Sequence, residues 1–376
     1  MQINKCQSVG LITLFISAAS WYGTADAGTL LVCATCNHTT IQSAVNDAAD
    51  NDEINIAAGR YIENITISGK SLTLLGAGSV GNNGETLVLA AGRGPVFTLG
   101  SGVAADTNHV VLLDGLVISG GNHNGGSGVG GGVQVRSGAY LRMVSCTVRG
   151  SYATFGGGIG VSSPGAPTST IVSSLITDNT APGPQGKASA GGGVFVGQGS
   201  SIAIDSSTIA HNSSGGGGGI YGEQGSSVTL TNTTVTGNTA TSYSTPQGPT
   251  DGDGAGMETL GDFSISDSIF SFNTSFGNNG GGGLLMAIHD SGPHTISRTT
   301  FTHNGLFLAN DLRGGGIFAY AYATGSYTLD NSFVEQNLEG GGIWNDSNIT
   351  AVITNTVVTD NVGGNICNAN ASGGCQ

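Results

Sequence analysis

The densest group of side chains that could do acid–base chemistry lies between residues 289 and 303. It consists of His289, Asp290, His294, Arg298 and His303. Elimination from a uronic acid requires a cation beside the carboxylate, a base for the neighbouring proton and an acid for the leaving oxygen, and arginine and histidine can supply these. The first four residues are our candidate catalytic set, and His303 is a candidate substrate contact. The competing interpretation is that all five are ordinary polar residues of turns and loops.

Four other arginines could also contact a ligand. Arg136, Arg142 and Arg149 form the one local cluster of basic residues, and Arg313 ends an insertion between two repeats. These four are candidate contacts for a sugar or an anion. Arg298 differs from them because it occupies a column otherwise filled by serine, asparagine or aspartate, and its fork of five donors suits carboxylate recognition. Ordinary exposed positions explain the other arginines equally well.

One loop offers oxygen ligands for a hard cation. Asp251 and Asp253 flank a glycine, with Glu258 and Asp262 nearby. Calcium prefers such carboxylate oxygens. No glutamate stands at the spacing of a calcium hand, so a plain acidic surface loop is the alternative. Calcium is the one cofactor for which the sequence offers ligands.

Cysteines lie near both ends of the chain. In an exported protein Cys33 with Cys36, and Cys367 with Cys375, are candidate disulfides. Cys146 is then expected to be a small apolar residue of a strand.

Residues 1–27 have the pattern of a secretory signal peptide. Lys5 supplies a basic start, residues 9–19 an apolar core, and residues 25–27 a small-residue cleavage site. No later stretch is long and apolar enough to cross a membrane as a helix. We therefore expect a secreted protein, extracellular or periplasmic, with a single domain over residues 28–376 and no membrane span after cleavage.

The elements that position these residues follow from a repeat between residues 130 and 366. A glycine cluster followed by one aliphatic residue recurs there, at intervals of variable length. Such spacing is typical of a stacked unit that carries loops, because insertions are tolerated only where they leave the stack. The clusters end at Val133, Ile159, Val194, Ile220, Met257, Leu284, Ile317, Ile343 and Ile366.

Two polar columns accompany the glycine clusters. Most units end in an asparagine that follows a short β-type stretch, namely Asn179, Asn212, Asn238, Asn273, Asn304, Asn337 and Asn361. A second column precedes it, consisting of Ser173, Ser206, Asn232, Asp267, Arg298, Asn331 and Asn355. Asparagine tolerates sharp bends, and stacked amides can bond from one rung to the next.

The pattern predicts an all-β fold. Each unit contains three short strands separated by bends, and stacked units form parallel sheets about 4.8 Å apart between strands, a three-sheet solenoid. Residues 39–49 are the one predicted helix, with capping-box spacing between Thr39 and Gln42. We expect it to cap the open end of the hydrophobic core, because the last rung of a solenoid otherwise exposes apolar surface.

Composition excludes several classes of protein. Of 376 residues 67 are glycine and only 9% are charged, which excludes a helical protein, while 38% hydrophobic residues argue against disorder. The net charge of −14 and the lack of a basic patch make nucleic acid an unsuitable partner.

The chain resembles right-handed parallel β-helices of the pectate-lyase-like superfamily over nearly all of its mature length. The resemblance rests on residues 40–45, 54–61 and 72–78, and the glycine clusters with the Phe-x-x-Asn motifs are similar to those of polymorphic outer-membrane proteins. The chain lacks the Asp-Asp pair and Gly-His-Gly of polygalacturonase-type hydrolases and the Arg-x-Pro-x-x-Arg pattern of pectate lyases. No catalytic residue is therefore carried over from the family.

The resemblance implies a secreted monomer that binds an extracellular polysaccharide or cell-surface glycan, and it leaves open whether the chain also cleaves it by β-elimination or hydrolysis. The larger insertions leave one corner of successive rungs and would form a wall beside a groove. A non-enzymatic surface or adhesion module is the main alternative, because the repeats are regular and titratable residues are sparse. Ice or mineral binding would require a flat threonine array in strict register.

Overall fold

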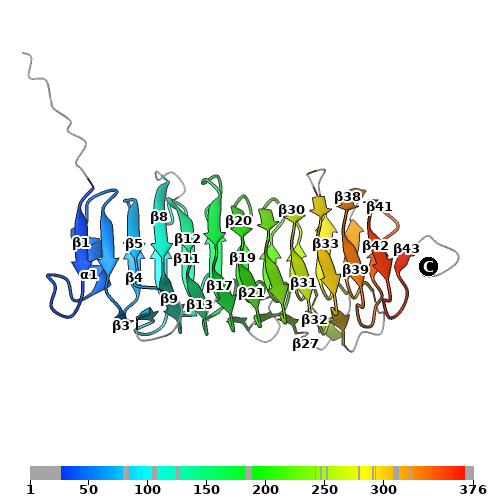
Figure 1. Ribbon diagram of the computed structural model, residues 1–376, viewed down its shortest axis with the longest axis horizontal. Helices are drawn as coiled ribbons and strands as arrows, with labels where there is room; N and C mark the ends of the chain where they lie inside the picture. The colour runs from blue at the N-terminus through cyan, green and yellow to red at the C-terminus, as the bar shows by residue number, and fades with distance from the viewer. Residues whose placement is uncertain are drawn as a thin grey trace, which may run out of the picture.

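The computed structural model is a rod in which successive segments of the chain follow one another along the long axis (Figure 1). It describes residues 27–78, 84–103, 108–123, 128–182, 189–241, 243–245, 248–250, 253–277, 280–289, 292, 294–307, 313–321 and 324–368. Each coil of the rod adds one strand to each of three long parallel sheets, and most central coils add one to a short fourth sheet. The predicted signal peptide lies outside the described residues, apart from Ala27.

Sheet A has twelve strands and runs the whole length of the rod. Its strands alternate buried and solvent-facing side chains, as expected where one face packs on the core. They are β1 (Thr29–Val32), β2 (Glu53–Ile56), β5 (Leu72–Leu75), β8 (His109–Asp114), β12 (Ala139–Val144), β16 (Ser169–Val172), β20 (Ser201–Asp205), β24 (Ser227–Thr231), β30 (Asp262–Ser266), β34 (His294–Ser297), β38 (Gly325–Asp330) and β41 (Ile349–Thr354).

Sheet B follows sheet A in each coil and has eleven strands, most of them three residues long. In these short strands the middle side chain points inward and the outer two face away from the core. They are β3 (Gly59–Ile62), β6 (Thr86–Leu89), β9 (Leu116–Ser119), β13 (Thr147–Arg149), β17 (Leu175–Thr177), β21 (Thr208–Ala210), β25 (Thr234–Thr236), β31 (Ile269–Ser271), β35 (Thr300–Thr302), β39 (Phe333–Glu335) and β42 (Val357–Thr359).

Sheet C closes each coil and has eleven strands. From β11 onward each strand begins directly after a glycine cluster. They are β4 (Ile65–Ile67), β7 (Phe97–Leu99), β11 (Val133–Arg136), β15 (Ile159–Ser162), β19 (Val194–Val196), β23 (Ile220–Gly222), β29 (Met257–Thr259), β33 (Leu284–Ile288), β37 (Ile317–Ala321), β40 (Ile343–Asn345) and β43 (Ile366–Asn368).

The expectation of three sheets is incomplete, because a short sheet D with seven two-residue strands lies between B and C. From β18 onward these strands begin at the residue after the ladder asparagine, where the sequence suggested the start of an insertion. They are β10 (Asn122–His123), β14 (Tyr152–Ala153), β18 (Thr180–Ala181), β22 (Ser213–Ser214), β26 (Thr239–Ala240), β32 (Thr274–Ser275) and β36 (Gly305–Leu306). One insertion adds an antiparallel hairpin of β27 (Tyr243–Thr245) and β28 (Gly248–Thr250).

The polar columns form the corners of the coils, as predicted. The Nδ2 of Asn238 donates to Oδ1 of Asn273 at 3.0 Å, and Asn273 donates in the same way to Asn304 at 2.9 Å. The ladder runs from Asn179 to Asn361 along one edge. These amides are buried over most of the ladder, so their bonds satisfy backbone groups at bends that water does not reach.

The glycine clusters allow neighbouring coils to approach closely. Gly191 has a φ of 66°, a conformation that residues with a side chain rarely adopt. A Cβ on Gly192 would lie 2.4 Å from the carbonyl oxygen of Gly218 in the next coil. The clusters thus mark both the bend and the tightest contact between rungs.

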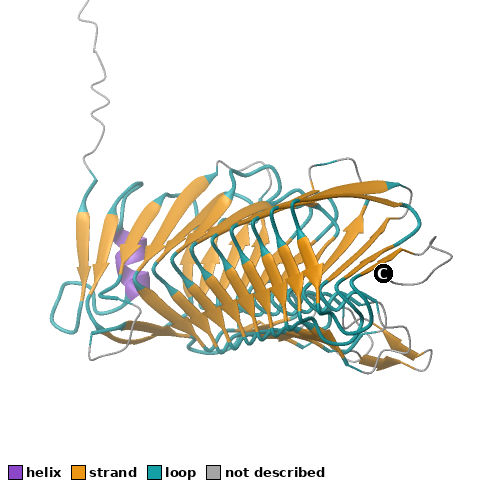
Figure 2. Ribbon diagram, turned by 45° about the vertical axis from the view of Figure 1, so that its right-hand side comes forward, coloured by secondary structure: helices purple, strands orange, loops and turns teal. Residues whose placement is uncertain are grey.

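A continuous apolar core fills the rod, and helix α1 (Ile41–Asp47) covers its N-terminal end (Figure 2). The helix is shorter than residues 39–49, because Ala48 is already extended. Its N-cap is Thr40, whose side chain accepts from Ser43 N–H, rather than the Thr39–Gln42 pair we expected. The carboxylate of Glu63 accepts the N–H groups of Ile41 and Gln42 at 2.8 and 2.9 Å.

Cysteine chemistry agrees with the sequence where it is described. Cys33 and Cys36 form a disulfide. Cys367 is also disulfide-bonded, while its predicted partner Cys375 lies outside the described residues. Cys146 is free and buried, and burial raises the pKa of its thiol to about 12. Among the described residues no helix has the length and apolar character needed to span a membrane.

Candidate functional site

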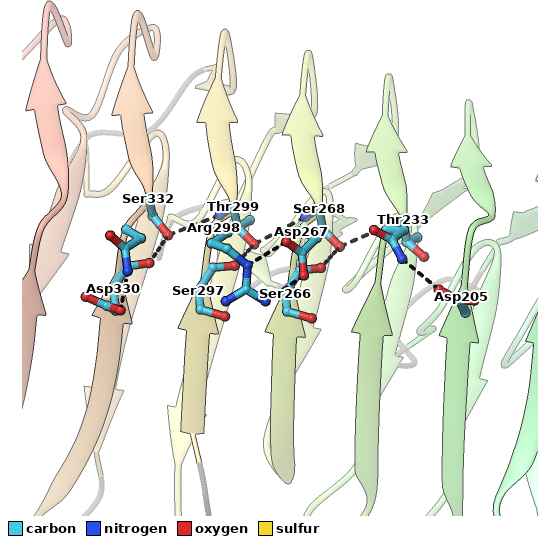
Figure 3. Close-up of polar contacts among 12 residues, drawn as sticks. Asp205, Thr233, Ser266, Asp267, Ser268, Ser297, Arg298, Thr299, Asp330 and Ser332 are labelled. Atoms are coloured by element: carbon cyan, nitrogen blue, oxygen red, sulfur yellow. Dashed lines mark hydrogen bonds and ion pairs between the residues drawn. The ribbon is translucent and has the colours of Figure 1, made fainter.

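Arg298 lies at the corner where sheet A turns into sheet B, and it does not present a free guanidinium. Its Nε and Nη2 donate to the two carboxylate oxygens of Asp267, one coil earlier, at 2.6 and 2.7 Å (Figure 3). The bidentate bond lowers the pKa of Asp267 and raises that of Arg298. Both side chains are exposed, so the ion pair joins two neighbouring coils at the surface of the rod.

The same corner continues as a row of polar side chains in the next coils. The carboxylate of Asp330 accepts from Thr354 Oγ1 at 2.6 Å and from Asn355 Nδ2 at 3.0 Å, and these bonds lower its pKa. Toward the N-terminus, Asn232 donates to Asp205 at 3.2 Å. Arg298 is the one cation of this row between Asp205 and Asn355, and a carboxylate already holds it.

Beneath the corner, hydroxyl groups tie each coil to the next. The backbone N–H of Thr233 donates to Ser268 Oγ at 3.1 Å, and that of Thr299 donates to Ser332 Oγ at 3.1 Å (Figure 3). These side chains are buried. These bonds hold the backbone of neighbouring coils in register at the corner.

Sheet B presents two columns of outward side chains beside this corner. The first runs through Leu175, Thr208, Thr234, Ile269, Thr300, Phe333 and Val357. The second runs through Thr177, Ala210, Thr236, Ser271, Thr302, Glu335 and Thr359. Hydroxyls and apolar groups therefore share one face, and Ile269, Phe333 and Val357 are 45 to 46% exposed.

The far corner of sheet B carries an exposed aromatic pair. Phe272 is 59% exposed and its ring stacks on that of His303, with centroids 4.9 Å apart and an interplanar angle of 25°. The Nδ1 of His303 lies 2.8 Å from the hydroxyl of Thr302. His303 and Arg298 therefore lie at opposite ends of one strand, β35, and bound the same face. We define the sheet B face as Asp267, Ile269, Phe272, Arg298, Thr300, Thr302, His303, Phe333 and Glu335.

The predicted catalytic set is not assembled in one place. His294 begins β34 on its inward face, with its side chain 2% exposed and its ring 5.2 Å from that of Phe263. Its Nε2 lies 4.0 Å from Asp262 Oδ1, and Arg298 follows the other end of β34. Four residues of extended strand span about 13 Å. His289 follows β33 at the corner of sheets C and A, and Asp290 lies outside the described residues.

The three clustered arginines are separated as well. Arg136 ends β11 of sheet C, Arg142 lies in β12 of sheet A and Arg149 ends β13 of sheet B. All three side chains are exposed, but they point from different sheets of one coil. They therefore cannot act together on one anion, although Arg149 belongs to the outer face of sheet B, several coils before Arg298.

Arg313 lies over the outer face of sheet C, with its guanidinium 4.7 Å from the ring centroid of Trp344. This cation–π contact is part of an outer apolar layer in which Leu285, Ala287 and Phe318 are buried. The insertions that we expected to form a wall begin with the short strands of sheet D, and part of each insertion lies outside the described residues.

The predicted calcium site is described only in part. Asp253 is buried, and its carbonyl oxygen accepts the N–H of Gly217 at 3.1 Å. Asp251 lies outside the described residues. Within the described ranges no three histidine, cysteine, aspartate or glutamate side chains converge in a way that could hold a metal ion.

Of the sheet B face, sequence reasoning singled out only Arg298 and His303 as site candidates. Asp267 was recognised as a corner residue but not as the partner of Arg298, and Phe272 and Phe333 were not singled out. A signal was present for Phe272, because other units fill its position with polar or small residues. The position of Phe333 gives no such signal, because other units place leucine, isoleucine or valine there. Only the alignment of strands between neighbouring coils shows that these residues lie on one face.

The match to one protein family agrees with the fold. The profile of the family described as right handed beta helix region matches residues 96–273. A solved structure, titled crystal structure of pectate lyase Pel9A, is 14% identical, with a TM-score of 0.40 over 93% of this chain and 81% of that chain. At this level of similarity the match carries no information on activity. No curated protein has a significantly similar sequence.

Proposed function

We propose that this chain is a secreted, monomeric, non-catalytic protein that binds an extracellular polysaccharide along the sheet B face. The observation that carries the proposal is that exposed aromatic side chains and hydroxyls lie together on the outer side of sheet B. Phe272 and Phe333 are 59% and 46% exposed, and Thr300 and Thr302 lie in the coil between them. Sugar rings have an apolar face and a polar edge, which this combination matches.

The regular spacing of the face supports binding of a polymer rather than a single sugar. Adjacent coils place equivalent side chains about 4.8 Å apart, and the two outward columns continue over many coils. A polysaccharide lying along the rod can therefore repeat its contacts. Each single contact is weak, but repeated contacts on one chain add through their high effective concentration.

Binding is favoured over cleavage by the positions of the titratable groups. His294 is buried in the core at one end of β34, and Arg298 is held by Asp267 beyond the other end. One sugar unit cannot contact both. On the sheet B face itself, His303 is the one histidine, and its ring is stacked on Phe272.

The proposal is tested by affinity electrophoresis of the full chain in gels containing neutral or uronic polysaccharides. Phe272→Ala and Phe333→Ala should each weaken binding about fivefold, because each removes one stacking contact worth about 1 kcal/mol. Tyr152→Ala is the matched control, since Tyr152 is 47% exposed on sheet D. Absence of binding to every polysaccharide, or equal losses in all three variants, would overturn the proposal in favour of a surface or adhesion module.

A further inference from the structure

The rod changes shape where sheet D ends. Sheet D stops at β36, whereas sheets A, B and C each continue for further coils. The cause is visible in the chain, because only Leu338 and Glu339 separate the ladder residue Asn337 from the next glycine cluster. Leu338 N–H still donates to Asn304 O at 2.7 Å, but no sheet D strand follows. No strand of sheet D therefore pairs with β36 on the side that faces the C-terminal coils.

A cavity of about 560 Å³ lies beside β36, where sheet D ends. Its walls are mainly apolar. Gly305 contributes no side chain, and a Cβ at this position would lie 3.0 Å from the Cβ of Leu338. The size is typical of sites that take small organic molecules. The lining residues are Thr274, Phe276, Gly305, Leu306, Phe307, Leu338, Glu339 and Val362.

The chemistry of the lining points to a positively charged ligand. The rings of Phe276 and Phe307 lie 5.5 Å apart and are tilted by 53°, so they present faces and edges to the same space. Ring faces attract ammonium groups. Glu339 is the one ionisable side chain among the lining residues, and it is exposed at the rim. The net charge of −14 on the whole chain acts in the same direction.

We propose that this cavity binds a small organic cation in which an aromatic or branched aliphatic group carries a quaternary or protonated amine. The apolar group packs among Leu306, Leu338 and Val362, and the charged nitrogen lies between the phenylalanine rings and the Glu339 carboxylate. The site is separate from the sheet B face, and it does not depend on polysaccharide binding.

The experiment is a ligand-observed NMR titration of the full chain with benzyltrimethylammonium and with benzylsulfonate, two ions of similar size and opposite charge. The cation should bind, and the anion should bind at least about fivefold more weakly. Phe307→Ala should weaken binding of the cation about tenfold, because it removes a ring contact and apolar area. Glu339→Gln should reduce the preference for the cation about threefold.

Two control variants separate these effects from general ones. Tyr152→Ala removes an aromatic ring on sheet D that is 47% exposed, and Asp47→Asn removes a carboxylate that is 71% exposed near the other end of the rod. Neither should change the affinity for benzyltrimethylammonium. Failure of this cation to bind, equal affinity for the two ions, or equal affinity of the wild type and both cavity variants would overturn the proposal.

Discussion

At the scale of single residues, the Arg298–Asp267 pair is the most specific feature of the corner. The arginine holds the pKa of Asp267 below its ordinary value of 3.8. Because this pKa is lower in the folded than in the unfolded chain, the pair stabilises the fold above pH 3.8, and this contribution is lost as the pH falls through the lowered value.

We therefore expect Arg298→Ala to raise the pKa of the Asp267 carboxyl toward its ordinary value, measured by NMR titration of the side-chain carboxyl. The carboxyl of Asp178, which is exposed four coils before Arg298 in the rod, serves as an internal control. The difference in unfolding temperature between wild type and variant should shrink in acid. An unchanged pKa of Asp267 would show that the pair does not form in solution.

The sequence identified Arg298 as an exception in its column but could not identify its partner. Asp267 lies 31 residues earlier, and the pairing exists only because the two coils are stacked in register. In the same way, period-two patterning identified inward residues well, whereas the separation of His294 from Arg298 depends on where β34 begins and ends. Contacts between coils are long-range in sequence, and they decide which candidate residues meet.

At the scale of elements, the asparagine ladder holds the corners that position the sheet B face. Asn238 Nδ2 donates to Ile209 O at 2.9 Å, and its Oδ1 accepts from the N–H of Asn212 at 3.0 Å. Replacing the amide leaves several buried backbone groups without partners.

Asn238→Ala should therefore lower the free energy of unfolding by about 2 to 4 kcal/mol, since each unsatisfied buried group costs about 1 to 3 kcal/mol. Urea unfolding followed by circular dichroism measures the loss. Thr234→Ala, at a half-buried outward position of β25 in the same coil, is the matched control and should change stability far less. Equal losses in the two variants would mean that the ladder is not a source of stability.

The ladder and the glycine bends were predictable, because each depends on a local residue preference repeated at a fixed place in the coil. The N-terminal helix occurs once and was predictable from its own local sequence. Sheet D was not predicted, since its two-residue strands are too short to show a period. The sequence nonetheless indicates the early end of sheet D, because Asn337 and Asn361 are followed almost at once by glycines.

At the scale of the whole molecule, different surfaces of the rod carry different kinds of side chain. Part of sheet C, from β33 to β40, is covered by an outer apolar layer, the sheet B face combines rings with hydroxyls, and a cavity opens where sheet D ends. The fold class followed from the repeat alone. The choice of surface did not, because the longest insertions drew attention to the corner beside sheet C, while Phe272 and Phe333 are exposed at sheet B.

The most direct test of the central claim is hydroxyl-radical footprinting of the full chain with and without a polysaccharide that it binds. Oxidation of Phe272, His303 and Phe333 should fall when the polysaccharide is present, while oxidation of Tyr152 on sheet D should stay the same. Protection of Tyr152, or of residues on sheet C, with no change at Phe272 and Phe333 would contradict it.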